Sequence, residues 1–195
     1  MRIVAGALRR RPIATPPDGA TRPTSDRARE AIFNILEHAP WSAGLDDARV
    51  IDLFAGSGAM GLEALSRGAA TCLFVERAEP ALACIRANLD AFGLAPRARI
   101  LRQDATRLAR RIDAEARFDL ALLDPPYGKG LGETALMALN AGGWLADDAI
   151  VVLERGADEA ELTLPGFETL DERRYGAAKV TFLAPLPPAS GGEAG

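Results

Sequence analysis

The sequence predicts an α/β domain in which a doubly wound, mostly parallel sheet of seven strands carries helices on both faces. Three observations lead to this expectation. Short apolar runs alternate along the chain with segments of helical periodicity. A strand, a glycine turn and a helix follow one another in residues 49–61 (RVIDLFAGSGAMG), which is typical of a nucleotide-binding crevice. The last two expected strands lack a long helix between them and should form an antiparallel hairpin at the sheet edge.

Length and composition indicate one cytoplasmic globular unit. The chain has 195 residues, of which 48% are hydrophobic, and no apolar run of membrane-spanning length. Cys72 and Cys84 are isolated, so we expect two buried free thiols. His38 is the single histidine, which argues against a zinc site or a histidine-based triad. We therefore expect no metal and no membrane association.

The net charge of −4 conceals a basic N-terminal segment. Residues 1–29 carry seven arginines and two aspartates, whereas the rest of the chain carries 16 basic and 25 acidic residues. A basic arm on an acidic body favours a polyanionic partner docked at one edge. A solvated basic tail would produce the same pattern, so charge alone leaves both interpretations open.

The first part of the chain is expected to form a hairpin followed by a helix. Residues 1–5 and 11–15 predict two short strands around Gly6, and residues 16–19 (PPDG) predict a turn. Apolar residues at helical spacing predict an amphipathic helix over residues 25–37. Thr24 or Ser25 can cap its start, and Pro40 ends it.

Strands and helices then alternate to the end of the sheet. After the glycine turn a helix begins at Ala59, and Gly93 is the expected cap of a later helix. Further strands are expected at 71–76, 99–101, 118–123 and 149–154, and further helices at 80–92, 106–114 and 132–140. Residues 167–174 and 179–184 are the expected hairpin, and residues 185–195 predict a disordered tail.

The glycine turn fits more than one cofactor. Gly56, Gly58 and Gly61 match a dinucleotide fingerprint, and Glu76 lies where a ribose-binding acid is expected, so an NAD-dependent oxidoreductase is a competitor. A turn without a ligand is the plainer alternative, which an aspartate within the preceding strand disfavours. Asp104 follows the third strand and offers an acceptor for an adenine amino group. The motif after the fourth strand has no evident use in hydride transfer.

That motif, residues 124–127 (DPPY), suits a nucleobase amine. An exocyclic amine is a poor nucleophile because its lone pair is delocalised into the ring. The Asp124 carboxylate and the Pro125 carbonyl can accept its two N–H groups and favour the pyramidal nitrogen that attack requires, while Pro126 stiffens the backbone. The ring of Tyr127 offers a face on which an unpaired base can stack. The sulfonium methyl of S-adenosylmethionine (SAM) would be the electrophile.

Several segments together carry a resemblance to a known family. DLFAGSGAMGLEALSRGA (52–69), FVE (74–76), QDA (103–105) and DPPY (124–127) resemble the ordered motifs of SAM-dependent N-methyltransferases. RPTSDRAREAIFNIL (22–36) is similar to the arm of the RsmD-type 16S ribosomal RNA (guanine-N2)-methyltransferases. The resemblance covers residues 1–183 and implies a Rossmann-like methyltransferase fold.

The resemblance also implies roles for individual residues. Asp52 and the glycines would shape the pocket for the methionine end of SAM, Glu76 would bind the ribose and Asp104 the adenine. The expected cofactor-binding set is Asp52, Phe54, Gly56, Ser57, Gly58, Glu76, Arg77, Asp104 and Ala105. The expected catalytic set is Asp124, Pro125, Pro126 and Tyr127. The expected RNA-binding set is Arg9, Arg10, Arg11, Arg22, Thr24 and Arg27, although surface ion pairing would also account for Arg22 and Arg27.

We thus expect SAM-dependent methylation of guanine N2 in 16S ribosomal RNA or the small ribosomal subunit, by a monomeric protein. Residues 1–39 would form an arm over cofactor and RNA, residues 40–184 the methyltransferase domain and residues 185–195 a tail. A DNA adenine-N6 methyltransferase shares DPPY and is the main rival, although the chain leaves no room for a separate sequence-reading domain. A non-catalytic Rossmann-like RNA-binding module is the rival outside enzymes.

Overall fold

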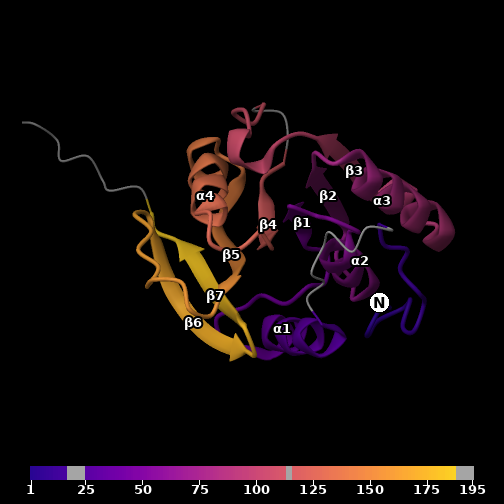
Figure 1. The fold of residues 1–195 in the computed structure, drawn as a ribbon, viewed down its shortest axis with the longest axis horizontal. Coiled ribbons are helices and arrows are strands. Elements are labelled where there is room, and N and C mark those ends of the chain that lie inside the picture. Colours follow the sequence, from indigo (N-terminus) through magenta and orange to yellow (C-terminus); the bar gives the residue numbers. More distant parts are fainter. Residues whose placement is uncertain (17–24, 113–115, 188–195) are drawn as a thin grey trace, which may run out of the picture.

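A mixed sheet of seven strands forms the centre of the molecule (Figure 1). The computed structural model describes residues 1–16, 25–112 and 116–187. The strand order is β3-β2-β1-β4-β5-β7-β6; neighbours from β3 to β5 are parallel, and β7 is antiparallel to both of its neighbours. The bounds are β1 Arg49–Leu53, β2 Thr71–Glu76, β3 Ala98–Arg102, β4 Phe118–Leu123, β5 Leu145–Gly156, β6 Phe167–Tyr175 and β7 Ala178–Pro185.

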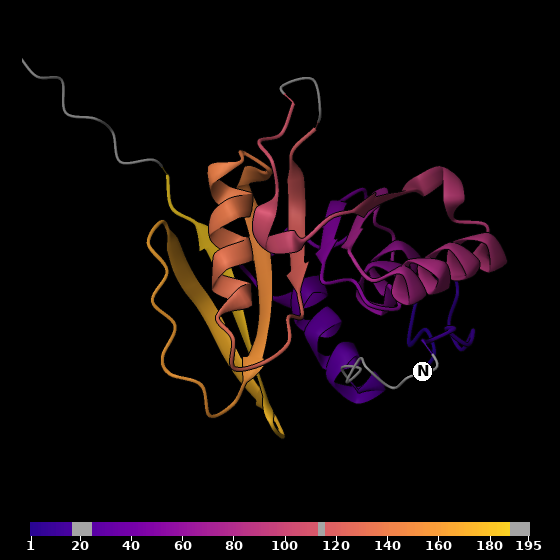
Figure 2. The same ribbon diagram turned by 45° about the horizontal axis from the view of Figure 1, so that its top comes forward.

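Helices cover both faces of this sheet (Figures 1 and 2). The α-helices of the described ranges are α1 Asp26–His38, α2 Ala59–Ser66, α3 Glu79–Phe92 and α4 Leu131–Ala141. Alternate residues of a strand point to opposite faces. Val50 of β1 therefore packs in one apolar cluster with α1, α2 and α3, whereas Ile51 and Leu53 pack in a second cluster with α4. Within the described ranges no helix is both long and apolar enough to cross a membrane.

The order of the strands creates a crevice between β1 and β4. From β1 the chain proceeds to β2 and β3 on one side, whereas from β4 it proceeds to β5 on the other. Helices that follow β1 and β4 consequently pack on opposite faces, which leaves an opening at the carboxyl ends of these two strands. In doubly wound sheets such a switch point is where ligands bind.

The predicted doubly wound sheet and its antiparallel edge hairpin are confirmed. Gly93 caps α3 in the left-handed conformation, with φ of 69°. Ser25 caps α1 and accepts a hydrogen bond from the Ala28 amide at 3.1 Å, whereas Thr24, the other predicted cap, lies outside the described residues. Both cysteines are free thiols; Cys72 is buried as expected, but Cys84 is only half-buried.

The two predicted N-terminal strands are reduced to one antiparallel bridge, between Arg2 and Pro12. The pairing ends at the turn, because the Arg11 amide, which would bond to the Ile3 carbonyl in a continued ladder, donates to the Leu8 carbonyl instead. The Val4 and Ala5 amides donate to the two carboxylate oxygens of Glu63 on α2, at 2.8 and 2.9 Å. Tertiary contacts thus replace sheet hydrogen bonds in this segment.

The helix predicted over residues 106–114 is wrong within its described part. Only a single 3₁₀ turn, Ala105–Arg107, forms there. The chain is instead bound to the loop that follows α4, because the Arg111 backbone amide donates to the Gly142 carbonyl and its Nε donates to the Gly143 carbonyl. Residues 113–115, together with residues 188–195 of the predicted tail, lie outside the described ranges.

Candidate active site

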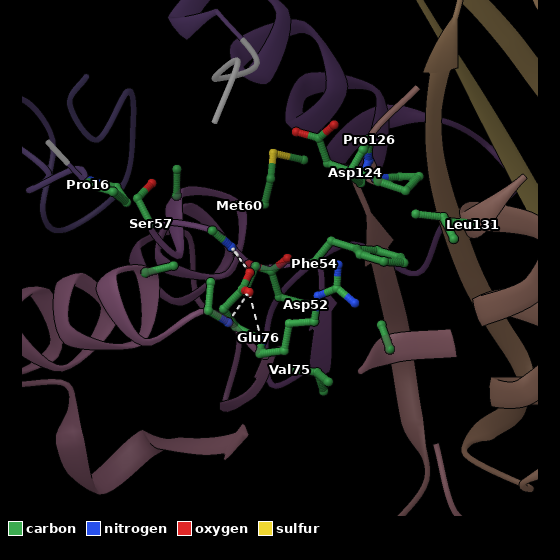
Figure 3. Close-up of a pocket in the computed structure, with 18 of the residues that line it drawn as sticks. Pro16, Asp52, Phe54, Ser57, Met60, Val75, Glu76, Asp124, Pro126 and Leu131 are labelled. Atoms are coloured by element: carbon green, nitrogen blue, oxygen red, sulfur yellow. Dashed lines mark hydrogen bonds between the residues drawn. The ribbon is translucent and has the colours of Figure 1, made fainter. Parts of the chain in front are cut away.

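A cavity of about 720 Å³ opens at the carboxyl ends of the parallel strands (Figure 3). Its size falls within the range of about 300–1,000 Å³ that is usual for small-molecule sites. Of the predicted cofactor-binding and catalytic residues, those that line it are Asp52, Phe54, Gly56, Ser57, Glu76, Arg77, Asp104, Ala105, Asp124, Pro125, Pro126 and Tyr127. The structure therefore brings together side chains from four different strand ends.

The glycine turn between β1 and α2 is a strained, tightly packed segment. Phe54, Gly56 and Gly58 all have positive φ values, of 58°, 55° and 82°. This conformation is uncommon for a phenylalanine and is characteristic of functional sites. Gly58 is the one predicted cofactor-binding residue that does not line the cavity; it caps α2 in the left-handed conformation. Its part in the site is to shape the turn.

Gly61 allows α2 to approach the sheet closely. A β-carbon at this position would lie 2.4 Å from the Phe74 ring and 2.6 Å from the Cys72 sulfur, both on β2. The third glycine of the motif therefore serves helix–strand packing, which is the role it has in nucleotide-binding folds.

Asp52 is a buried acid below the turn, with only 2% of its surface exposed. One of its carboxylate oxygens accepts a hydrogen bond from the Gly61 amide at 2.9 Å, which attaches α2 to β1. Burial raises the pKa of Asp52 to about 7; the bond from Gly61 opposes this rise and the charge of Glu76 adds to it. The carboxyl is therefore poised to titrate near neutral pH.

Glu76, at the end of β2, joins the glycine turn to the loop that follows β2. Its Oε2 accepts from the Gly56 amide at 2.9 Å, and its Oε1 accepts from the Arg77 and Ala78 amides at 2.7 and 2.8 Å (Figure 3). A carboxylate has about four acceptor positions, so three backbone bonds leave capacity for a ligand hydroxyl.

Asp104, after β3, is fixed by its neighbours. Its Oδ1 accepts from the Thr106 amide and hydroxyl at 3.0 and 2.7 Å, and its Oδ2 accepts from Arg77 at 2.9 Å. The hydrogen bonds from Thr106, and then the charge and bond of Arg77, lower the pKa of Asp104 below its usual value. The predicted adenine acceptor is therefore ionised at neutral pH and is already oriented.

The Asp-Pro-Pro-Tyr loop after β4 is anchored from behind by two glutamates. The Tyr127 hydroxyl donates to Glu154, a buried residue on β5. Glu159 accepts from the Gly128 amide at 3.0 Å and from the Gly156 amide at 2.8 Å. Figure 3 shows Asp124 and Pro126 on one side of the cavity and Glu76 on the other.

Sequence reasoning missed these glutamates and part of the cavity wall. Glu154 ends the apolar run AIVVLE, and an acid within a buried strand is the one signal that could have identified it. Further lining residues come from the arm, from α1, α2 and α4, and from the loop after β3: Met1, Pro16, Arg29, Met60, Gln103 and Leu131. Arg29 lies within the segment that carried the resemblance, but its burial could not be read from the sequence.

The described arginines of the predicted RNA-binding set lie outside the cavity lining. Arg9, Arg10, Arg11 and Arg27 do not line the cavity in the described part of the chain, and Arg9, Arg10 and Arg11 are exposed there. Arg11 is partly engaged, since its guanidinium donates to the Ala91 carbonyl and lies 4.6 Å from the centre of the Phe92 ring. Arg27 is exposed near the start of α1. Arg22 and Thr24 lie outside the described residues.

Known proteins are similar to this chain in both sequence and fold. The chain is 36% identical over 166 residues to the putative rRNA methyltransferase YlbH of Bacillus subtilis, covering 85% of the chain and 86% of the relative. It is also 36% identical over 165 residues to ribosomal RNA small subunit methyltransferase D of Escherichia coli, covering 85% and 79%.

Two solved structures extend this likeness to the fold. A putative methyltransferase of Escherichia coli superposes with a TM-score of 0.80 at 30% identity, over 95% of this chain and 98% of that one. A putative methylase of Haemophilus influenzae superposes with a TM-score of 0.78 at 26% identity, over 96% and 99%. The seven-stranded sheet is thus the α/β methyltransferase fold. A family model described as conserved hypothetical protein 95 matches residues 1–184, and the chain therefore belongs to this family, the RsmD family that its motifs had predicted.

Proposed function

We propose that the chain transfers a methyl group from SAM to the exocyclic N2 amine of a guanine in 16S ribosomal RNA. The observation that carries this proposal is the convergence of the Asp-Pro-Pro-Tyr loop with the glycine turn, Glu76 and Asp104 around one cavity. The names of the relatives from Bacillus subtilis and Escherichia coli support ribosomal RNA as the substrate class. Guanine N2 follows from the resemblance of the motifs.

The chemistry of the cavity fits SAM. Glu76 presents a carboxylate to the ribose hydroxyls, and Asp104 presents an ionised acceptor to the adenine amino group. The buried Asp52 lies below the glycine turn, where the methionine end would bind. When bound, SAM supplies the electrophilic methyl group.

The protein residues hold the nucleophile. Asp124 lines the cavity at the end of β4, where its carboxylate can accept one N–H of the target amine while the Pro125 carbonyl accepts the other. Two fixed acceptors favour a pyramidal nitrogen whose lone pair is directed at the methyl group. Tyr127 offers its ring to the base, and its hydroxyl is bonded to Glu154, so the ring is held in one orientation. Positioning and exclusion of water are thus the contributions of this chain to catalysis.

We assign RNA binding to the N-terminal arm. We place phosphate contacts on Arg9, Arg10, Arg11 and Arg27 and, in the segment outside the described residues, on Arg22 and Thr24. Residues 1–39 are proposed as the RNA-facing arm of a methyltransferase domain formed by residues 40–184. The arm reaches the cavity through Met1 and Pro16, which fits a role in covering the cofactor.

Nucleoside analysis tests the proposal. Unmodified 16S ribosomal RNA, assembled small subunits and duplex DNA are each incubated with the protein and methyl-labelled SAM, then digested and separated. Label in N2-methylguanosine is expected, and it should vanish with Asp124→Ala while S-adenosylhomocysteine still binds. Label in N6-methyladenine of DNA would establish the rival methyltransferase instead. Absence of transfer to any substrate, with RNA still bound, would favour the non-catalytic binding module.

A further inference from the structure

Arg29 is a buried arginine in the wall of the cavity. It lies on α1, none of its side chain is exposed, and it lines the same cavity as Asp52 and Asp124. A fully buried guanidinium normally has all its N–H groups paired, because an unpaired buried donor is energetically costly. The pairing of Arg29 is incomplete.

The partners of Arg29 account for part of its hydrogen-bonding capacity. Its Nη2 donates to the Arg2 carbonyl and, at 2.9 Å, to Asp26. Its Nε lies 3.5 Å from a carboxylate oxygen of Glu63, an ion pair without hydrogen-bond geometry. Its Nη1 is buried and has no hydrogen-bond partner among the described residues. The charge of Arg29 is therefore neutralised and its position fixed, while one nitrogen with two hydrogens is left unbonded in a residue that lines the cavity.

The contacts of Arg29 place it near the end of the cavity that the glycine turn forms. Glu63, its ion-pair partner, lies one turn after the start of α2, and Met60 of the same helix lines the cavity. Ser57 in the turn donates to the Met1 sulfur, which brings the arm to this same end. Glu76 and Asp104, which the proposed function assigns to ribose and adenine, come from the strand ends of β2 and β3.

The ionisable groups of the cavity are predominantly acidic. Its described lining contains the carboxyls of Asp52, Glu76, Asp104 and Asp124. Arg29 and Arg77 are the basic side chains of that lining, and Arg77 is bonded to Asp104. SAM carries an ammonium and a sulfonium group, which suit such a cavity, and one carboxylate, which does not. That carboxylate needs a donor at the methionine end.

We propose that the Nη1 of Arg29 donates hydrogen bonds to the carboxylate of the methionine moiety of SAM. This inference rests on SAM being the cofactor under the proposed function. Its chemistry is that of a guanidinium bonded to a carboxylate in a water-poor site, where charge-assisted bonds are strongest. Arg29 is pre-positioned by Asp26 and Glu63, so the carboxylate meets an arginine whose side-chain entropy is already lost.

The test compares two ligands that differ in the carboxylate alone. Calorimetry measures the affinities of S-adenosylhomocysteine and of its decarboxylated analogue, the 3-aminopropyl thioether of 5′-deoxyadenosine. Arg29→Lys retains a positive charge between Asp26 and Glu63 but lacks the second nitrogen. We expect this variant to bind S-adenosylhomocysteine about 10- to 100-fold more weakly, the effect of losing a hydrogen bond to a charged group, and to bind the analogue as the wild type does.

Arg67→Lys is the matched control. Arg67 is also a buried arginine bonded to Glu63, at 2.8 Å, and its Nη2 also lacks a hydrogen-bond partner within the described ranges, but it does not line the cavity. We expect Arg67→Lys to lower the melting temperature as Arg29→Lys does and to leave the preference for the carboxylate intact. Circular dichroism verifies that both variants are folded.

Other outcomes overturn the assignment. Equal weakening of both ligands would make Arg29 a structural residue. Unchanged binding of both ligands, or a loss of RNA affinity alone, would show that Arg29 does not bind this carboxylate. Failure of the wild type to bind S-adenosylhomocysteine would refute the proposed cofactor itself. That result is distinct from the outcomes that refute only the role of Arg29. If Arg29→Lys does not fold, nitrogen-15 arginine spectra of the wild type decide, because the Arg29 resonance must shift with S-adenosylhomocysteine and not with the analogue. Arg67→Lys, and Arg155→Lys at another buried arginine, on β5, assign the remaining buried resonances.

Discussion

Asp52 shows how burial, the largest influence on its pKa, can make one residue sensitive to pH. Because its pKa is raised to about 7, the folded chain holds a proton on Asp52 that the unfolded chain, with a pKa near 4, has already released. Its contribution to stability is therefore complete below about pH 4 and is lost as pH rises through about 7.

We expect Asp52→Asn to remove this component of the pH dependence. The difference in unfolding free energy between variant and wild type should change by up to ~4 kcal/mol between pH 4 and pH 8, with the wild type relatively more stable at the acidic end. Urea unfolding at a series of pH values measures it. Parallel profiles for the two proteins would show that Asp52 titrates normally.

The hydrogen bond of the Tyr127 hydroxyl leads to a second prediction at the residue scale. Its bond to the buried Glu154 holds the ring beside Asp124, so Glu154→Ala should lower kcat/KM by about 10- to 100-fold and leave the affinity for S-adenosylhomocysteine unchanged. Glu154→Gln keeps an acceptor oxygen and should retain most of the activity. Tyr127→Phe combined with Glu154→Ala should cost no more than the larger single effect; additive losses would show that the two residues act separately.

Sequence reasoning located the residues that follow strands and missed those that support them. Asp52, Glu76, Asp104 and Asp124 could be identified because each lies in or directly after an apolar run, and parallel strand ends meet at one edge. Glu154 bonds a residue 27 positions away in the chain, and Glu63 bonds amides 58 and 59 positions away. Such contacts leave no periodic signal in the sequence.

At the scale of elements, the close contact of α2 with β2 depends on a missing side chain. Gly61→Ala would place a β-carbon 2.4 Å from the Phe74 ring, so α2 or the ring must shift. We expect a loss of stability of about 1–3 kcal/mol, measured by thermal or urea unfolding, together with weaker binding of S-adenosylhomocysteine as the turn moves. The cost should be smaller in a Phe74→Leu background; an equal cost there would place the conflict elsewhere.

The helix expected at 106–114 does not form over residues 108–112, and the reason lies in contacts with a neighbouring element. Its residues have adequate helical propensity, but propensity is a weak preference that tertiary bonds override. Arg111 gains two bonds to the glycine-containing turn after α4, which a continuous helix would forfeit. In contrast, β1, β2 and β4 were predicted well because each contains a run of buried apolar residues, which have no other place in the fold.

At the scale of the whole molecule, the contrast between the basic arm and the acidic body leads to a prediction about RNA affinity and its dependence on salt. Arg9 and Arg10 are exposed, whereas Arg11 is engaged with Ala91 and Phe92. We expect Arg9→Ala/Arg10→Ala to weaken binding to 16S ribosomal RNA. The slope of log affinity against log salt should fall by about 1 for each phosphate that the variant no longer neutralises. Filter binding at several salt concentrations measures this.

Two comparisons separate electrostatic from structural effects in that experiment. The double variant should melt as the wild type does and bind S-adenosylhomocysteine equally well, because neither arginine lines the cavity. Arg11→Ala should instead lower the melting temperature, because it removes the hydrogen bond to Ala91 and the stacking on Phe92. An unchanged salt slope in the double variant would remove these arginines from the RNA-binding surface.

The carboxylate of Glu63 also has a consequence for the order in which the chain folds. It receives the Val4 and Ala5 amides and is paired with Arg29 and Arg67, so these contacts of the arm cannot form until α2 exists. During synthesis the arm leaves the ribosome before α2 does, and it must wait for the segment that carries Glu63. We therefore expect residues 4 and 5 to reach their native positions only after α2 has folded.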